Sequence, residues 1–285
     1  PEFKRMLARH RKGEPLEAND KEVKSITYVY CVGSRQAEGE NEYCSRYCCT
    51  AAIHAANQVN RRFPEIQNYH VHRGIRSYGK QEILYEESCT NGDIYFQCLD
   101  DEPPEITEGD SGILVKVNDV MTWGSELEFS TDLVVLVTGM VSRKNDRLIG
   151  ILKVPVGRDR FFNEVHPKLK PVEVVIDGVF IAGACHGPKN VREAMNSALS
   201  AAVKSNALVS AGEIELEPTM AKVNQGVCKG CFECAQACPF DAVSKTQHQG
   251  RPVAVVVEAN CKGCGMCIPV CPTDAMQLIG NSDSE

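Results

Sequence analysis

The chain has 285 residues, a formal net charge of -7, 43% hydrophobic residues and 15 cysteines. Its length allows two domains with a buried core, so disulfides are not needed for stability. The acidic balance disfavours nucleic acid as a main partner, and no apolar run approaches the ~18 residues that a membrane span needs. An odd cysteine count with several Cys-x2-Cys pairs indicates metal ligation in a reducing compartment, which predicts a cytoplasmic protein.

The N-terminal half shows the pattern of an α/β protein. Residues 1–24 are charged and lack periodicity, which predicts an arm or linker. The β-branched and aromatic run over 25–30 predicts a buried strand, and 67–72 alternates like a second strand. Apolar residues at helical spacing from Ala52 to Phe63 predict a helix between them. Strand, loop, helix and strand in this order are typical of the opening of a Rossmann-like domain.

Further elements continue the pattern. We expect a helix over 80–88, a buried strand over 133–137, a strand over 178–183 and a helix over 190–208 with an apolar face. The two histidines of the second strand, His70 and His72, are expected to be one exposed and one packed.

The C-terminal part of the chain contains an internal repeat, in which Cys228–Pro239 matches Cys261–Pro272. Each copy has the pattern Cys-x2-Cys-x2-Cys-x3-Cys-Pro. At this spacing three cysteines hold three corners of a 4Fe-4S cube, and the fourth reaches the other cube. The repeat therefore predicts two clusters, one held by Cys228, Cys231, Cys234 and Cys271 and the other by Cys261, Cys264, Cys267 and Cys238.

A structural zinc site is the alternative for this repeat. Zinc prefers two separated Cys-x2-Cys pairs, whereas each copy here compresses four cysteines into eleven residues. Two cubes that share ligand loops lie close enough for electron transfer. We therefore expect this module to conduct electrons, and we assign no catalytic residue to the chain.

A second group of cysteines follows the first predicted strand, where a Rossmann domain places its phosphate-binding glycine loop. The G-x-G-x-x-G pattern is absent from the whole chain. The loop instead carries Cys31, Cys44, Cys48 and Cys49. Beside a helix N-terminus, which favours thiolates, four cysteines are able to hold a third iron–sulfur cluster. A few buried thiols with a redox disulfide are the alternative.

Several segments resemble the A-type subunits of heterodisulfide reductases. They are Tyr30–Arg35, Glu42–Cys49, Tyr78–Lys80, Phe161–Leu169 and Gly178–Lys189, in consistent order. Members of that family carry FAD on a thioredoxin-reductase-like core with several 4Fe-4S clusters around it. The resemblance implies a non-standard cluster on the cysteines of the 31–49 loop, and thus three 4Fe-4S clusters in all.

The resemblance also implies what the chain lacks. The family's N-terminal portion contains a cluster domain and the G-x-G-x-x-G of the FAD domain, and neither is present here. The chain begins at Pro1, and we expect it to be the C-terminal half of such a protein, as a split subunit or a fragment. FAD would then be shared with a partner chain that supplies the missing half.

The flavin side of this chain is expected where the strand over 178–183 passes into a helix. Glycines there permit close approach, and helix N–H groups favour a negatively charged reduced flavin. Many flavoproteins have Gly-Asp where this chain has Gly183-Ala184, and an ordinary strand–turn–helix without ligand is the alternative. The predicted FAD contacts are Gly139, Gly183, Ala184, Cys185, Gly187, Pro188, Lys189 and Val191.

The fold class is therefore α/β Rossmann-like, as part of a two-dinucleotide-domain flavoprotein, followed by a small α+β bacterial-type 2×4Fe-4S ferredoxin domain. The predicted parts are the arm (1–24), the flavoprotein-type domain (25–209) with its inserted cluster loop (31–49) and FAD-contacting segment (178–209), a linker (210–219), the ferredoxin domain (220–279) and a tail (280–285).

The resemblance implies an oxidoreductase subunit that relays electrons between the ferredoxin module and FAD, with flavin-based electron bifurcation as in the family. Expected partners are other heterodisulfide-reductase-type subunits and an electron donor such as a hydrogenase or formate dehydrogenase subunit, or ferredoxin. A plain ferredoxin-like carrier and an assembly subunit, both without flavin, are the alternatives. An NAD(P)H oxidoreductase is disfavoured because cysteines replace the nucleotide loop.

Overall fold

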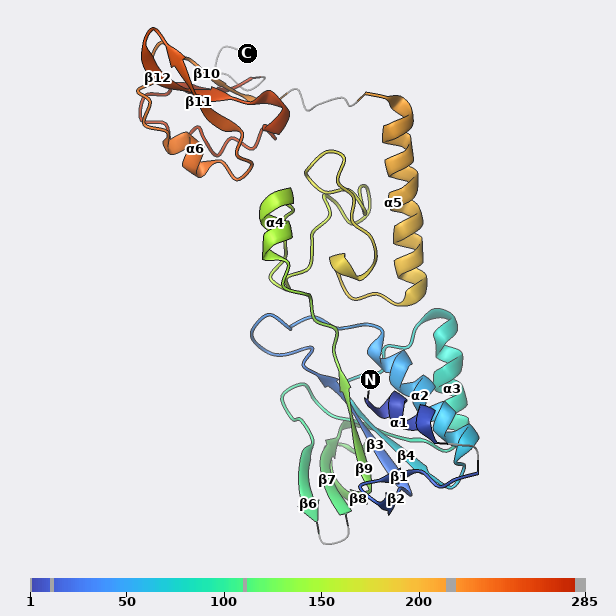
Figure 1. Cartoon of the computed structure of the whole chain (residues 1–285). Helices are drawn as coiled ribbons and strands as arrows, with labels where there is room; N and C mark the ends of the chain where they lie inside the picture. The colour runs from blue at the N-terminus through green and yellow to red at the C-terminus, as the bar shows by residue number, and fades with distance from the viewer. Residues whose placement is uncertain (1, 11–12, 110–111, 214–218, 280–285) are drawn as a thin grey trace. The chain divides into compact units, whose positions relative to one another are not determined.

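The computed structural model describes residues 2–10, 13–109, 112–213 and 219–279 (Figure 1). The predicted tail 280–285 and half of the predicted linker lie outside the described residues. No described helix is long and apolar enough to cross a membrane. The described residues form two compact units: the first is the N-terminal part to Lys144 with 156–162 and 182–198, and the second is 145–155, 163–181 and the chain from Leu199 onward.

The first unit is built on a four-stranded parallel sheet (Figure 1). Helix α2 (Cys48–Arg62) connects the first two of its strands, and α3 (Glu82–Thr90), preceded by a short 3-10 turn (Gly79–Gln81), leads to the third. This is the order of a Rossmann-like sheet, so the predicted fold class is confirmed. The strands lie in the order β5 (Ile94–Gln97), β4 (Gln67–His72), β3 (Ser25–Val32) and β9 (Leu133–Thr138).

The strand order reverses between β3 and β9, which are neighbours in the sheet although the rest of the sheet lies between them in sequence. In open α/β sheets this switch point, at the carboxyl ends of the strands, is where ligands bind. The predicted cysteine loop leaves the carboxyl end of β3. The sheet topology therefore places that loop at the position where a Rossmann domain binds its cofactor.

An antiparallel three-stranded sheet connects β5 to β9 in place of a crossover helix. Its strands are β6 (Glu105–Gly109), β7 (Gly112–Asp119) and β8 (Ser125–Thr131). Val115 and Val117 of β7 pack with Val71 of β4 in a small core. The turn between β7 and β8 contains a 3-10 segment (Val120–Thr122) and Trp123, the only tryptophan of the chain, which is fully exposed.

The N-terminal segment differs from the predicted arm. It forms helix α1 (Glu2–Arg9) and a hairpin of β1 (Glu17–Ala18) and β2 (Lys21–Glu22). Leu7, Leu16 and Val23 of this segment are buried in the main core of the first unit. Three isolated apolar residues without a period anchor it, which is why hydrophobic periodicity did not detect the packing.

The predicted strand over 178–183 is wrong. Gly178 and Gly183 have φ of +77° and +72°, a left-handed conformation that interrupts a pleated strand. The segment forms an isolated bridge between Glu173 and Phe180 and then a 3-10 turn (Gly183–His186). The helix predicted after it is present as α5 (Val191–Ala211), and a short α4 (Asp146–Leu152) precedes the region.

The predicted boundary between a 25–209 domain and the ferredoxin domain also differs from the structure. Residues 145–155 and 163–181 belong to the same compact unit as the C-terminal domain. Ion pairs join Lys262 to Asp177 and Lys153 to Asp241, the latter at 2.7 Å.

The C-terminal domain consists of two antiparallel strand pairs around the cysteine motifs. Strand β10 pairs with β13, and β11 pairs with β12, while α6 lies within the first motif. Val253 and Ala254 of β12 pack in the core together with motif cysteines. The elements are β10 (Ala221–Val223), α6 (Glu233–Ala237), β11 (Val243–His248), β12 (Arg251–Val256), a 3-10 turn (Glu258–Asn260) and β13 (Met276–Leu278).

Candidate iron–sulfur and flavin sites

The two cysteine motifs of the C-terminal domain match in exposure at three of their four cysteines, and differ at the first, where Cys228 is buried and Cys261 is intermediate. The second cysteine of each motif, Cys231 and Cys264, is exposed, whereas the third, Cys234 and Cys267, is buried. The fourth cysteines are intermediate in both copies. The sequence repeat is therefore partly a repeat of side-chain exposure, although only the first motif contains a helix, α6.

The structure brings a cysteine of the first motif to the three leading cysteines of the second. Cys238, Cys261, Cys264 and Cys267 line one small apolar pocket. Burial, together with the charges of Cys261, Cys238 and Cys264, raises the pKa of the Cys267 thiol to about 11. A positive cluster iron favours the thiolate form instead and would reverse this effect. These four are the residues that the repeat assigns to one cluster.

Backbone N–H groups surround the crossing cysteines at equivalent positions. Ala242 donates to the Sγ of Cys238 at 3.3 Å, and Ala275 donates to the Sγ of Cys271 at 3.2 Å, so the offset is four residues in both copies. Despite burial, hydrogen bonds from the backbone and side chain of Thr273 and from the backbone of Ala275 lower the pKa of Cys271. A sulfur that accepts several N–H donors suits a thiolate ligand of a cluster.

Two motif glycines sit where a side chain has no room. A Cβ on Gly230 would overlap the carbonyl oxygen of Pro252, and a Cβ on Gly263 would overlap that of Thr219. Both glycines also have positive φ, at +70° and +62°. Each motif loop therefore packs directly against backbone, which holds the cysteines on either side of the glycine in place.

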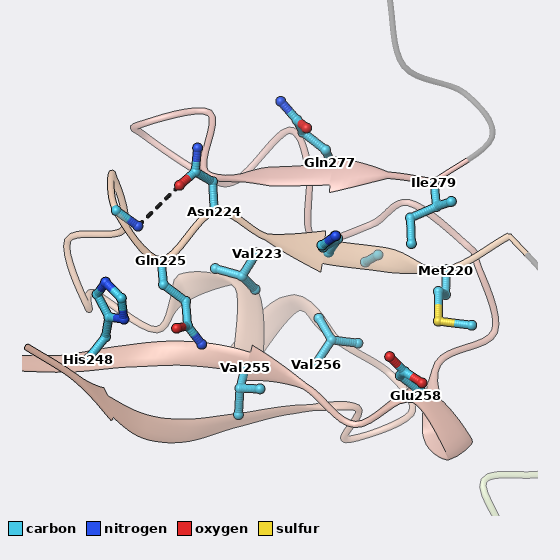
Figure 2. A pocket seen from close by; sticks show the side chains of 13 residues that line it. Met220, Val223, Asn224, Gln225, His248, Val255, Val256, Glu258, Gln277 and Ile279 are labelled. Carbon is cyan, nitrogen blue, oxygen red and sulfur yellow. Dashed lines mark hydrogen bonds between the residues drawn. The ribbon is translucent and has the colours of Figure 1, made fainter. Parts of the chain in front are cut away.

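A larger open pocket of about 750 Å³ lies between the two strand pairs of this domain, and none of its lining residues is a cysteine (Figure 2). Val223, Val255 and Val256 form its apolar floor, and His248 and Glu258 lie at its margins. The pocket belongs to the surface of the ferredoxin domain and not to the predicted cluster sites.

The loop after β3 begins with a change of register. The pairing of β3 with β9 shifts between Val29 and Val32, and Cys31 within this irregularity has a φ of +61°. Such a bulge re-aims a side chain at the end of a strand. It accounts for the direction change that brings Cys31, a buried residue, toward the start of α2.

All four cysteines of this loop interact electrostatically. The pKa of Cys48 is raised by a hydrogen bond with Cys49, by burial and by the charges of Cys49, Cys31 and Cys44. The pKa of Cys49 is instead lowered, to about 7. The hydrogen bond from Cys48 and a backbone hydrogen bond from Arg76 lower it despite burial. Cys48 and Cys49 form the first turn of α2, where the helix dipole favours thiolates.

These contacts fit a polynuclear cluster held by thiolates, although no described group of three or more His, Cys, Asp or Glu side chains is arranged to hold a single metal ion. As thiolates, the four cysteines would repel one another, and positive iron would offset that repulsion. The charges of all four loop cysteines thus act on one another, and their ligation of a third cluster stays a prediction.

The residues that follow β9 pack against this loop and form hydrogen bonds with it. A Cβ on Gly139 would meet Cβ of Ser34 and Oγ of Ser45, both at 2.8 Å. Ser45 accepts a hydrogen bond from the N–H of Met140 at 2.7 Å, and Tyr43 donates to the carbonyl of Met140 at 2.8 Å. Gly139 thus packs against the cysteine loop, and its contact with FAD stays a prediction.

Arginines complete the surroundings of Cys31. Arg35 donates to the carbonyl of Arg73 at 2.5 Å and pairs with Asp100 at 2.8 Å. Burial and the charge of Cys49 raise the pKa of the Cys31 thiol, while Arg35 and Arg73 act in the opposite direction. These cations lie where they offset negative charge on the loop.

The predicted flavin segment has open space beside two of its glycines, and its sheet pairing is limited to the single bridge of Phe180 with Glu173. Gly183 and Gly187 have φ of +72° and +128°, and no atom lies within 4 Å of a Cβ built on either. Ala184 and Cys185 are exposed, Pro188 is buried, and Lys189 is partly buried just before α5. Gly183 donates its N–H to Oγ of Ser197, which fixes the turn to the helix.

The first turn of α5 is tied to the cysteine loop. Asn190 and Glu193 form a reciprocal capping box, with hydrogen bonds of 2.9 and 3.0 Å. Glu193 also pairs with Arg46 of the loop at 2.5 Å and accepts from Tyr78 at 2.9 Å. No spacing pattern predicts this contact, because an Arg, a Glu and a Tyr far apart in sequence carry no spacing signal. Arg46 and Tyr78 do lie in two of the segments that carry the family resemblance.

The face of the parallel sheet beneath α2 is unusual. Tyr28, His70 and Tyr95 stack across three adjacent strands, with ring centroids 4.9 and 4.3 Å apart. His70 and His72 are both buried, so the expectation that one is exposed is wrong. Residues two apart on a strand share a face, and here that face is covered.

Comparison with known proteins bears first on the C-terminal domain. The 4Fe-4S dicluster domain family matches residues 221–278. A Rossmann-like sheet with a cysteine-rich switch point, followed by a dicluster ferredoxin domain, defines an iron–sulfur oxidoreductase component.

Proteins that are similar to most of this chain identify its family. The second A-type iron-sulfur subunit of CoB--CoM heterodisulfide reductase from Methanopyrus kandleri is 37% identical over 85% of this chain. The A-type subunit of the H(2)/formate:CoB-CoM heterodisulfide,ferredoxin reductase from Methanococcus maripaludis is 36% identical, also over 85% of this chain. The chain belongs to the family of heterodisulfide reductase A-type subunits, and it spans 37% of the length of each of these two relatives.

Among solved structures, the flavoprotein disulfide reductase RclA from Escherichia coli has a TM-score of 0.41 and 8% identity over 71% of this chain and 40% of its own. A likeness this low carries no functional conclusion.

Proposed function

We propose that the chain is an electron-transfer component of a heterodisulfide-reductase-like iron–sulfur flavoprotein complex. The observation that carries this proposal is the convergence of Cys31, Cys44, Cys48 and Cys49 at the switch point of the sheet, in a chain that also contains the dicluster repeat. Clusters bound at these cysteines supply reversible one-electron transfer.

The chain's own residues would hold three 4Fe-4S clusters. The loop cysteines ligate one, and the two motifs share the others, with Cys238 and Cys271 as the crossing ligands. Arg35 and Arg73 offset the negative charge of the loop cluster. N–H donors to Cys238 and Cys271 stabilise their thiolates, which influences the reduction potential of each cluster.

FAD would be held jointly with a second polypeptide. The open glycines at 183 and 187 leave space for a ligand to approach the backbone, and Lys189 adds a cation before α5. The missing G-x-G-x-x-G must come from elsewhere, because this loop alone cannot bind a pyrophosphate. We assign that role to a partner carrying the N-terminal half of the flavin domain.

The surface of α5 supports such a partner. Val191, Met195, Leu199 and Val203 recur every four residues and form one stripe, and each is at least 60% exposed. An apolar helix face of this kind marks an interaction site. Because the relatives are longer than this chain, we propose that the flavin-domain half covers the stripe.

In the complex, electrons would pass between the ferredoxin domain and FAD through the loop cluster. One relative is named as part of an H(2)/formate-linked ferredoxin reductase, so we propose a hydrogenase or formate dehydrogenase subunit, or ferredoxin, as donor. We further propose bifurcation at the flavin, in which one electron goes to a higher-potential acceptor and one to a low-potential ferredoxin. The reducing compartment that thiolate ligands require suggests the cytoplasm.

Iron and flavin content of anaerobically purified protein, with its partners retained, tests the proposal. We expect about 12 irons per chain, at four per cluster, and flavin only when the partner is present. About 8 irons would mean that the 31–49 loop holds no cluster. An intact complex without flavin would favour a plain ferredoxin-like carrier.

A further inference from the structure

A row of buried, hydrogen-bonded polar side chains crosses the sheet face beneath α2. Parallel strands covered on both faces normally carry aliphatic residues there. Here His70 is fully buried, and the Asp93 side chain beside it is only 2% exposed. Burying such groups costs free energy unless they are hydrogen-bonded, so their arrangement demands a physical reason.

Each hydrogen bond in this row has an assignable donor and acceptor. Nε2 of His70 lies 3.4 Å from Oδ2 of Asp93, and Nδ1 of His70 lies 2.8 Å from the hydroxyl of Tyr30. Ser88, Asn60 and His70 also contact the Asp93 carboxylate, and they lower its pKa against the effect of burial. A carboxylate only accepts, so Nε2 carries the proton, and Nδ1 accepts from the Tyr30 hydroxyl.

The other end of this hydrogen-bonded row is Tyr30, which lies next to the loop cysteines in sequence and shares their core. Tyr30 precedes Cys31 in β3, and it packs in the same core cluster as Cys48 and Cys49. Its pKa is raised by burial and by the charges of Tyr95, Cys49, Tyr28 and Cys48. Asp93, His70 and Tyr30 thus form a continuous hydrogen-bonded row that ends at the residue preceding Cys31.

The titratable groups around His70 come from every element packed on it. They are Tyr28 and Tyr30 of β3, His72 of β4, Asp93 and Tyr95 at β5, and, beyond Tyr95, Tyr85 and Cys89 of α3. From α2, Cys48 and Cys49 act through Tyr30. Asp93 is the carboxylate in direct contact with the ring.

We propose that His70, oriented by Asp93 and acting through Tyr30, takes up a proton when the cluster at Cys31, Cys44, Cys48 and Cys49 is reduced. The inference rests on the proposed third cluster and deepens it, because it makes this cluster, unlike the two in the ferredoxin domain, a centre where electron and proton transfer are coupled.

The balance is one electron and one proton. The electron comes from a one-electron donor, such as dithionite in a titration, and enters the cluster. The proton comes from bulk water and binds Nδ1 of His70, which then donates to the Tyr30 oxygen. The Tyr30 hydroxyl proton is released from its bond to Nδ1 and turns toward the added negative charge. The net charge of the buried site is unchanged.

The pH range follows from the pKa of His70. Burial holds it below its usual value, against the effect of Asp93. With the cluster oxidised, the ring is therefore neutral at neutral pH. A reduced cluster adds negative charge and raises the pKa of the ring. At pH values between the pKa of the ring with the cluster oxidised and its pKa with the cluster reduced, the cluster becomes harder to reduce as pH rises.

An EPR-monitored redox titration of the intact anaerobic complex at several pH values tests the relay. We expect the potential of the third cluster to fall by about 59 mV per pH unit, the one-electron equivalent of a tenfold change in proton concentration. The two ferredoxin clusters in the same sample provide an internal reference that should show no comparable slope.

Two variants and one control complete the test. Tyr30→Phe removes only the hydroxyl, and His70→Gln removes the titrating group, so each should flatten the slope of the third cluster. His72→Gln is the matched control: His72 is buried two residues away on the same face, and its Nδ1 accepts from Gly74 instead. It should keep the full slope.

The outcomes separate the relay from the proposed function. About 12 irons with a flat slope in the unmodified protein would overturn the relay and leave the third cluster standing. A full slope in both Tyr30→Phe and His70→Gln would also overturn it. About 8 irons and no third EPR signal would overturn both the cluster and the relay.

Discussion

Arg46 and Glu193 form an ion pair of 2.5 Å that joins the cysteine loop to the first turn of α5. Arg46 follows Cys44 by two residues, and its own N–H donates to the Sγ of Cys44 at 3.3 Å. Glu193 closes the capping box with Asn190. One pair of side chains therefore connects the proposed cluster site to the start of the proposed flavin helix.

Replacing Glu193 with alanine should loosen that connection. The variant loses a helix cap and an ion pair, which together correspond to about 1–2 kcal/mol of unfolding free energy. Denaturant unfolding followed by far-UV circular dichroism measures the loss. Glu82→Ala, in the first turn of α3, is the matched control and should cost less, because no ion pair of Glu82 is found among the described residues. Equal losses would contradict a specific role for the pair.

Gly139→Ala should disturb the third cluster alone. The added methyl group meets Ser34 and Ser45, so either the end of β9 or the cysteine loop must move. We expect iron to fall from about 12 to about 8 per chain, while the EPR signals of the ferredoxin clusters persist. Gly150→Ala in α4, where a Cβ meets nothing within 4 Å, should retain all the iron. Full iron in Gly139→Ala would show that the loop tolerates the shift.

In the ferredoxin domain, Gly230→Ala should reduce iron content by as much as the two clusters together, about 8 per chain. The methyl group would overlap the carbonyl of Pro252, and the two clusters share ligand loops. Gly265→Ala is a strict control, because its φ of +74° is equally left-handed but no atom lies within 4 Å of a Cβ there. It should cost only about 1–2 kcal/mol of backbone strain and keep its clusters. Similar iron loss in both would contradict the packing argument.

Stability should fall on acidification because of His72. Burial and the neighbouring His70 lower the pKa of His72 to about 4. Its unfolded value is about 6.5, so the unfolded chain binds a proton first, and stability is lost as pH falls below about 6.5. Between pH 7 and pH 5 this one residue accounts for about 2 kcal/mol. Denaturant unfolding of the protein and of His72→Gln, each at both pH values, measures this contribution. The variant should lose less stability between the two pH values than the parent. An identical loss would contradict the assignment to His72.

Leu199→Asp should block the partner without unfolding this chain. A charge in the centre of the α5 stripe cannot be buried against an apolar surface without a large desolvation cost. We expect the flavin-containing partner to be lost on co-purification, with iron content and circular dichroism unchanged. Ser200→Asp adds the same charge one residue away, outside the stripe, and should retain the partner. Co-purification of the partner with Leu199→Asp would show that the stripe is not the interface.

The dicluster domain could be predicted from sequence because iron–sulfur ligation imposes a short, regular cysteine spacing. Strand β4 begins and ends where the alternation over 67–72 predicted, and β3 extends its prediction by two residues to Val32. Local patterns encode these elements. The third cluster site needed the resemblance as well, since adjacent cysteines such as Cys48 and Cys49 do not indicate ligation by themselves.

What the sequence missed depends on tertiary contacts. The strand expected over 178–183 consists of strand-forming residues, but the left-handed glycines at its ends and the absence of a neighbouring strand among the described residues leave it irregular. Leu7 and Leu16 are buried by partners distant in sequence. The stack of Tyr28, His70 and Tyr95 arises only when three strands align, so no single strand reveals it.

Trp123, at the exposed turn between β7 and β8, is the chain's only indole, and its side chain contacts solvent rather than the core. Its fluorescence will therefore change little when the core unfolds. An unfolding curve followed by tryptophan emission would show almost no transition. The same isolation is useful in another way. Emission from this residue is a clean optical probe for any macromolecule that docks onto the turn.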